Sequence, residues 1–104
     1  MSFFKNLFRA QRTVDIKSTI EQGAFLVDVR EPGEVAQGGV PGAVNIPLGT
    51  VPLQLSTFKD KKNIIVFCRS GNRSGQAKTI LNQHGFTNVI NGGTWEQVKQ
   101  LVKR

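Results

Sequence analysis

The sequence predicts an α/β domain built on a mostly parallel β-sheet that is buried on both faces. Short apolar segments alternate along the chain with segments of helical periodicity. The apolar segments are continuous, rather than alternating with polar residues, which is typical of strands covered on both sides. In such sheets ligands bind beyond the carboxyl ends of the strands. The fold class therefore also predicts where a functional site should lie.

Length and composition fit one small domain. The chain has 104 residues, 38% of them hydrophobic, which is enough for one core. No apolar run approaches the ~18 residues of a membrane span, so we expect no transmembrane segment. One Cys and one His exclude an internal disulfide and a zinc site of the usual ligand number, and we expect neither metal nor cofactor. The unpaired thiol favours a reducing compartment, and the predicted location is cytoplasmic.

The charge balance favours anionic partners. Lys and Arg number 14 against 7 Asp and Glu, for a net charge of +7. Such a surface attracts small anions, acidic proteins, nucleic acids or anionic membranes. The basic residues are spread along the chain and form no basic and aromatic stripe of the RNA-binding type. We therefore expect no nucleic-acid partner.

Residues 1–11 are predicted to form an extension ahead of a domain over residues 12–104. Four apolar side chains of this extension share one face at helical spacing: Phe3, Phe4, Leu7 and Phe8. The spacing predicts a helix that docks on the domain. A helix that binds a membrane surface or a partner is the alternative.

The first half of the domain contains two predicted strands. A short helix is expected over residues 15–22, because Gly23 follows it at a position where glycine commonly ends helices. Residues 24–29, A-F-L-V-D-V, predict a buried strand, and residues 43–46 a short strand before Pro47. Proline and glycine break the chain between them, with a short helix after Pro32 whose first turn holds Glu31 and Glu34.

The second half repeats the alternation of strand and helix. Residues 51–57 predict a short helix, 63–67 the central strand, 74–84 a helix, 87–90 a last strand and 94–102 a closing helix. We expect Trp95 in the core and His84 in the last turn of its helix. Asp28 and Arg30, at a strand end, are interpreted as structural, with Asp28 capping the following turn or pairing with a nearby arginine, because buried charges are usually paired. A place for one of them at the rim of the site is the alternative.

The candidate reactive residues lie in the segment N-I-I-V-F-C-R-S-G-N-R-S at residues 63–74. Its apolar strand ends on the only cysteine, Cys68, and a glycine-containing loop with two arginines leads into a helix. A helix N-terminus and neighbouring arginines lower a thiol pKa from ~8.5, and loop N–H groups bind anions. The sequence therefore predicts Cys68 as the nucleophile. The predicted anion-binding residues are Arg69, Ser70, Gly71, Asn72 and Arg73, and Ser74 is expected as a further hydrogen-bond donor.

Four segments in order resemble the rhodanese-like sulfurtransferase family. They are F-L-V-D-V-R-E-P-G-E (25–34), G-G-V-P-G-A-V-N-I-P-L (38–48), I-I-V-F-C-R-S-G-N-R-S (64–74) and H-G-F-T-N-V-I-N-G-G-T-W (84–95). The resemblance implies a single rhodanese-like domain with a central five-stranded parallel sheet flanked by helices. It also implies that Cys68 carries a persulfide. Gly39 replaces the family's usual His, and Thr94 stands where the family often has Trp.

The loop length favours sulfur transfer over phosphate chemistry. Four residues separate Cys68 from Arg73, whereas related phosphatases with this fold have five. The predicted function is a thiosulfate-type sulfurtransferase that passes sulfur to cyanide, a thiol or a protein acceptor. A sulfur-relay or regulatory binding module with little turnover is the first alternative. A Cys-dependent phosphatase or arsenate reductase is the second.

Overall fold

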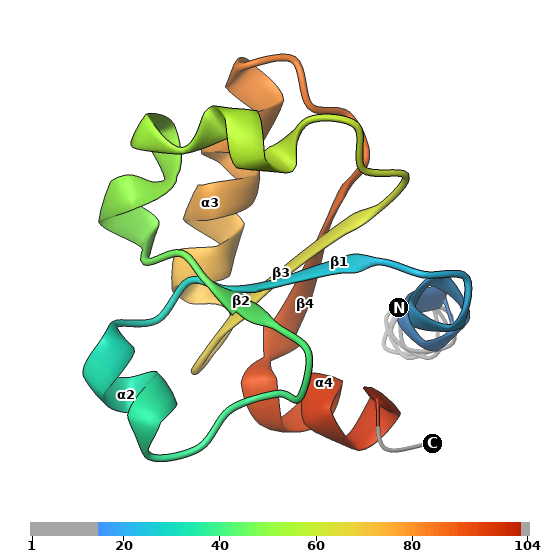
Figure 1. The fold of residues 1–104 in the computed structure, drawn as a ribbon, viewed down its shortest axis with the longest axis vertical. Helices are drawn as coiled ribbons and strands as arrows, with labels where there is room; N and C mark the ends of the chain where they lie inside the picture. Colours follow the sequence, from blue (N-terminus) through green and yellow to red (C-terminus); the bar gives the residue numbers. More distant parts are fainter. Residues whose placement is uncertain (1–14, 103–104) are drawn as a thin grey trace, which may run out of the picture.

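A computed structural model describes residues 15–102 and confirms the predicted parallel sheet (Figure 1). Four strands are present in this part of the chain: β1 (Phe25–Asp28), β2 (Val44–Asn45), β3 (Ile64–Cys68) and β4 (Val89–Thr94). Their order is β2-β1-β3-β4, and every neighbouring pair is parallel. The expected five-stranded sheet is therefore wrong for residues 15–102, where the remaining apolar segments form helices and turns. The predicted extension at residues 1–11 lies outside the described residues.

Helices connect the strands and cover both faces of the sheet. They are a helix over residues 15–21, α2 (Pro32–Ala36), η1 (Leu48–Leu53), η2 (Leu55–Phe58), α3 (Asn72–Gln83) and α4 (Trp95–Val102). The single helix predicted over residues 51–57 is wrong, because two 3₁₀ segments occupy this region. Pro52 lies inside the first and has no N–H to donate, and Gln54 leaves helical geometry at φ −127°. No helix in residues 15–102 is long and apolar enough to span a bilayer.

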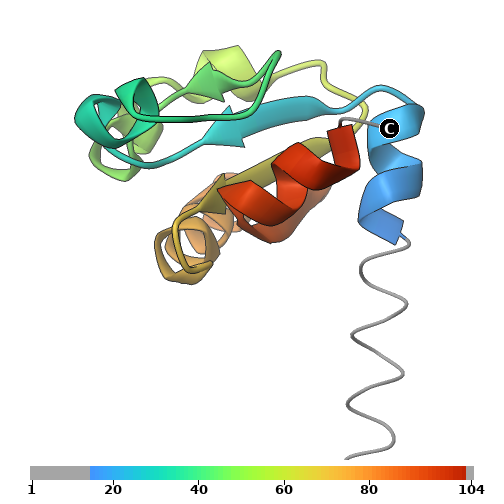
Figure 2. The same cartoon turned by 90° about the horizontal axis from the view of Figure 1, so that it is seen from below.

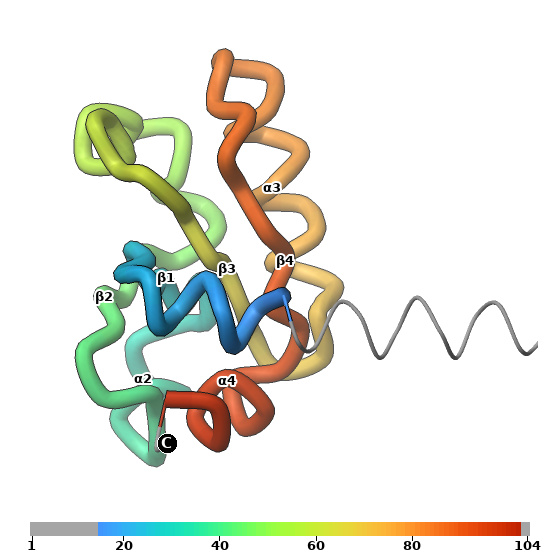
Figure 3. Tube along the Cα trace, turned by 90° about the vertical axis from the view of Figure 1, so that its right-hand side faces the viewer, coloured from blue at the N-terminus to red at the C-terminus, as the bar shows by residue number. Residues whose placement is uncertain are grey.

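The central strand β3 is buried along its whole length because its two faces pack into different clusters. Ile64, Val66 and Cys68 face a cluster that includes α3 and the 3₁₀ segments. Ile65 and Phe67 face a second cluster that contains residues of α4 and of the helix over 15–21. That helix lies beside the end of α4 (Figure 2) and crosses in front of the strands in Figure 3. The continuous apolar run of β3 follows from this two-sided burial.

Strand β4 extends beyond its predicted end at residue 90, through Gly92 and Gly93 to Thr94. Its register against β3 shifts at Val66 and Phe67, so that Gly92 forms a bulge. A Cβ on Gly92 would lie 2.8 Å from the Ile65 side chain, so any other residue requires the neighbouring side chains or strands to shift. The extension pairs Thr94 with Cys68, and the Asn91 side chain reaches the Gly71 carbonyl in the segment that follows Cys68.

Candidate active site

Cys68 is the last residue of the central strand and lies directly below the start of α3. The strand ends at Cys68, residues 69–71 turn, and α3 begins at Asn72. Gly71 makes the turn with φ +96°, a left-handed geometry that side chains disfavour, and it caps the helix. The helix thus starts two residues earlier than predicted. Its first N–H groups have no partner within the helix and are available to the sulfur.

Three groups approach the Cys68 sulfur. The Gly71 N–H donates to Sγ at 3.1 Å, and the Ser74 N–H donates at 3.4 Å. The Ser74 hydroxyl oxygen also lies 3.4 Å from Sγ. Ser74 directly follows the predicted anion-binding residues, and the sequence indicated it as a hydrogen-bond donor. It is the third residue of α3, where a free N–H faces back toward the helix cap.

These contacts favour the thiolate of Cys68. Burial raises the pKa of this thiol, since a charged sulfur loses solvation. The Ser74 hydroxyl and the N–H groups of Ser74, Ser70 and Gly71 lower the pKa by more, so the pKa of Cys68 lies below its ordinary value. The sulfur itself is fully buried. The site therefore combines a thiol of lowered pKa with burial of its sulfur from solvent.

The two arginines of the loop have different surroundings. Arg73 donates two hydrogen bonds to the Glu34 carboxylate of α2, at 2.7 and 2.9 Å. These bonds lower the pKa of Glu34 to about 2. Arg69 is exposed, as are Ser70 and Asn72. Arg69 is the loop residue that reaches the neighbouring pocket.

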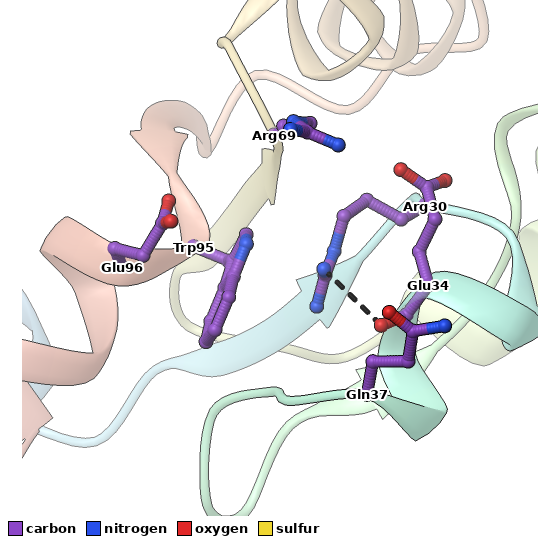
Figure 4. A pocket seen from close by; sticks show the side chains of 6 residues that line it. All are labelled: Arg30, Glu34, Gln37, Arg69, Trp95 and Glu96. Carbon is purple, nitrogen blue, oxygen red and sulfur yellow. Dashed lines mark hydrogen bonds between the residues drawn. The ribbon is translucent and has the colours of Figure 1, made fainter.

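That pocket has a volume of about 230 Å³ and mixed charge (Figure 4). It is lined by Arg30, Glu34, Gln37, Arg69, Trp95 and Glu96. Trp95, expected in the core, is only half-buried, because α4 begins at this residue where β4 leaves the sheet. The Arg30 guanidinium lies 4.6 Å from the Trp95 ring centre. The pocket lies beside the sulfur loop and is reached by its exposed arginine.

Asp28 and Arg30 form the structural pair that the sequence predicted. Arg30 donates to both carboxylate oxygens of Asp28 at 2.7–3.1 Å, and both residues are buried. The same guanidinium donates to the Gly38 carbonyl at 2.7 Å, which holds the backbone next to Gly39. A Cβ on Gly39 would lie 3.3 Å from the Val35 side chain. His84 caps the other end of α3 from Cys68 and is exposed.

Asn91 is a site residue that the sequence reasoning missed. It lies on β4, and its side chain contacts Ser74 and the Gly71 carbonyl. No local pattern marks it, because these contacts join residues 17 and 20 positions apart.

A buried thiolate at the carboxyl end of a parallel strand, held by helix N–H groups, is typical of enzymes that form a covalent bond to sulfur or another small anion. Similarity to known proteins identifies the family within this class of enzymes. The chain belongs to the rhodanese-like domain family, whose model matches residues 13–99.

Known relatives agree with this assignment. A sulfurtransferase of Allochromatium vinosum is 37% identical over 79% of this chain and 72% of its own length. The thiosulfate sulfurtransferase PspE of Escherichia coli is 45% identical over 64% of this chain and 66% of its own length. The solved structure of a rhodanese with anions from E. coli has a TM-score of 0.66 at 40% identity, over 72% of this chain and 91% of that one. The chain is thus a rhodanese-like protein with a sulfurtransferase or sulfur-relay role.

Proposed function

We propose that the protein transfers the outer sulfur of thiosulfate, or of a similar donor, through a persulfide on Cys68. The observation that carries the proposal is the pair of N–H donors on the buried sulfur, from Gly71 and Ser74. The same donors can hold either a thiolate or a persulfide anion. The relative PspE, whose name specifies thiosulfate, supports this choice of donor.

The first step is a displacement at sulfur. The Cys68 thiolate forms an S–S bond to the outer sulfur of thiosulfate, and the S–S bond within thiosulfate breaks. The electron pair of that bond leaves with sulfite, and Cys68 retains a persulfide anion. Sulfite is already a stable anion, so the step needs no proton from the protein. The exposed Arg69 guides the dianion to the loop, while Arg73 orders the loop through Glu34.

The second step removes the sulfur. An external nucleophile, such as cyanide, a small thiol or a protein thiol, bonds to the outer persulfide sulfur and regenerates the Cys68 thiolate. Because Cys68 is the only cysteine, no thiol of the chain can take over the sulfur. The chemistry suits a reducing compartment such as the cytoplasm, where both the thiol and its acceptors persist.

Intact mass after incubation with thiosulfate and desalting tests the proposal. We expect the wild type to gain the mass of one sulfur, cyanide to remove it, and Cys68→Ser to gain none. An unchanged wild-type mass, under conditions that load another sulfurtransferase, would contradict it. A loaded protein that turns over slowly with cyanide and small thiols favours the sulfur-relay alternative.

A further inference from the structure

The side-chain amide of Asn91 has a defined orientation. The Gly93 N–H donates to Oδ1 at 3.0 Å, and Nδ2 donates to the Gly71 carbonyl at 3.1 Å. A flipped amide would place donor against donor at the first contact and acceptor against acceptor at the second. Two backbone groups therefore determine that Oδ1, which can only accept, is the atom that faces Ser74.

This orientation determines the direction of the Ser74 hydroxyl. Ser74 Oγ lies 2.7 Å from Asn91 Oδ1 and 3.4 Å from Cys68 Sγ. A hydroxyl has one proton, and the short contact to an acceptor requires that proton to point at Asn91. The lone pairs of Oγ then face the sulfur. They can accept the S–H of a neutral Cys68, whereas a thiolate is stabilised by this hydroxyl only when its proton turns from Asn91 to Sγ.

We propose that Asn91 is a positioning residue that competes with the Cys68 sulfur for the hydroxyl proton of Ser74. While Cys68 carries a thiol, S–H donates to Oγ and the hydroxyl donates to Asn91. When the sulfur becomes an anion, the hydroxyl turns to it and leaves Oδ1 with the Gly93 N–H alone. Asn91 thereby stabilises the neutral form and limits how strongly the site holds an anionic sulfur.

The consequence for sulfur transfer rests on the proposed function. Cyanide removes the outer sulfur and leaves Cys68 Sγ as a thiolate, so a hydroxyl that donates to Sγ stabilises the leaving group. By holding that hydroxyl, Asn91 would slow release and favour storage of the sulfur on the protein. This predicts that removing Asn91 speeds release of the loaded sulfur to cyanide.

The charged groups already present around Cys68 are the same in all the test variants, and only Asn91→Asp adds one. Arg73 faces the sulfur from α3 with Glu34 paired to it, and Arg69 follows Cys68 in the loop. The buried Asp28–Arg30 pair lies at the end of β1, and Glu96 and Lys99 lie on α4. Strand β4 carries no titratable side chain from Val89 to Thr94. Differences between variants therefore report on Ser74 and residue 91.

The test measures the rate of alkylation of Cys68 by iodoacetamide against pH, which needs no sulfur transfer. Because Cys68 is the only thiol, the rate midpoint gives its pKa. Ser74→Ala should raise the midpoint, since the thiolate loses a donor. Asn91→Ala should lower it by about half a unit, the effect of one neutral hydrogen bond. In the Ser74→Ala background, Asn91→Ala should have no effect.

A second variant separates competition from loosening of the loop. Asn91→Asp loses the donor to the Gly71 carbonyl, as Asn91→Ala does, but it keeps the size and the acceptor and strengthens the competition, so the midpoint should rise. Part of that rise comes from the new charge, and it should shrink by about half a unit in the Ser74→Ala background. Shifts in the same direction for Asn91→Ala and Asn91→Asp would overturn the proposal. An Asn91→Asp shift of equal size in the wild-type and Ser74→Ala backgrounds would also overturn the proposal. This comparison does not use Asn91→Ala, so it remains valid if that variant does not fold.

Sulfur release is measured separately by intact mass. Asn91→Ala, loaded with thiosulfate, should lose its sulfur to cyanide about threefold faster than the wild type, and equal or slower rates would overturn this consequence. If the wild type takes up no sulfur, the proposed function fails, while the alkylation midpoints still decide the role of Asn91.

Discussion

The guanidinium of Arg73 and the carboxylate of Glu34 form a two-bonded ion pair between the first turn of α3 and α2, with N–O distances of 2.7 and 2.9 Å. Both side chains remain about one-third exposed, at 33% and 31%. Helix α2 has no buried residue, so polar contacts of this kind attach it to the domain. The pair therefore joins one wall of the pocket to the segment that holds Cys68.

Replacing Glu34 with Gln should give a stability difference that depends on pH. Arg73 lowers the pKa of Glu34 from 4.5 to about 2, so the folded state favours the carboxylate. A depressed carboxyl pKa contributes stability above the unfolded value, and this contribution is lost as pH falls toward the folded value. The wild type should melt higher than Glu34→Gln above pH 4.5, with a difference that shrinks toward pH 2.

Thermal unfolding at a series of pH values measures this effect. The pair is partly exposed, so the difference in Tm should not exceed about 5 °C. Glu96→Gln is the matched control, because it removes a carboxylate from the same pocket and leaves the pair with Arg73 intact. A Tm difference that is the same at every pH would show that ionisation of Glu34 does not contribute to stability in this way.

The two loop arginines should differ in their kinetic effects. Arg69→Ala should raise the apparent KM for thiosulfate about tenfold with little change in kcat, because Arg69 is exposed and is proposed to contact the donor before the reaction. Arg73→Ala should lower kcat as well, because the loop loses its link to Glu34. Steady-state thiocyanate formation measures both, and Lys78→Ala controls for the loss of one positive charge on α3. Equal, negligible effects would mean that backbone donors alone bind the anion.

Lengthening the loop should weaken sulfur transfer. A glycine inserted between Gly71 and Asn72 would move the Ser74 N–H relative to the Gly71 N–H, and both now donate to Sγ. A donor misplaced by about 1 Å costs ~10²-fold in rate, so thiosulfate turnover should fall by that order. Turnover and phosphate affinity are compared for both proteins after circular dichroism shows the variant folded. If the folded variant kept full activity, the length of the loop would not be what favours sulfur transfer over phosphate chemistry.

Gly92→Ala should destabilise the core. The new methyl group would lie 2.8 Å from Ile65 Cγ2 and 3.1 Å from Val98 Cγ2, within the bulge of β4. Overpacking of this kind costs about 1–3 kcal/mol. Urea denaturation measures the loss, and Gly33→Ala on α2, where a Cβ meets nothing within 4 Å, is the control. Equal stabilities of the two variants would show that β4 moves freely away from β3.

Local sequence alone determined the elements that carry the site. The apolar run of β3, the cysteine at its end and the glycine before α3 are neighbours in the chain, and their conformations follow from their own side chains. Family resemblance pointed to the same loop. The 3₁₀ turns at residues 48–58 escaped this reasoning, because apolar spacing does not distinguish them from an α-helix when Pro52 and Gln54 interrupt the hydrogen bonds.

Only the tertiary structure decided which distant side chains meet the sulfur loop. Arg73 finds Glu34 across 39 positions of sequence, and Asn91 reaches Ser74 across 17. These contacts depend on the register of β3 against β4 and on the bulge at Gly92, which a pattern of apolar residues does not encode. The proposed nucleophile could thus be predicted from consecutive residues, whereas the groups that orient its hydrogen bonds come together only when parallel strands end at one edge of the sheet.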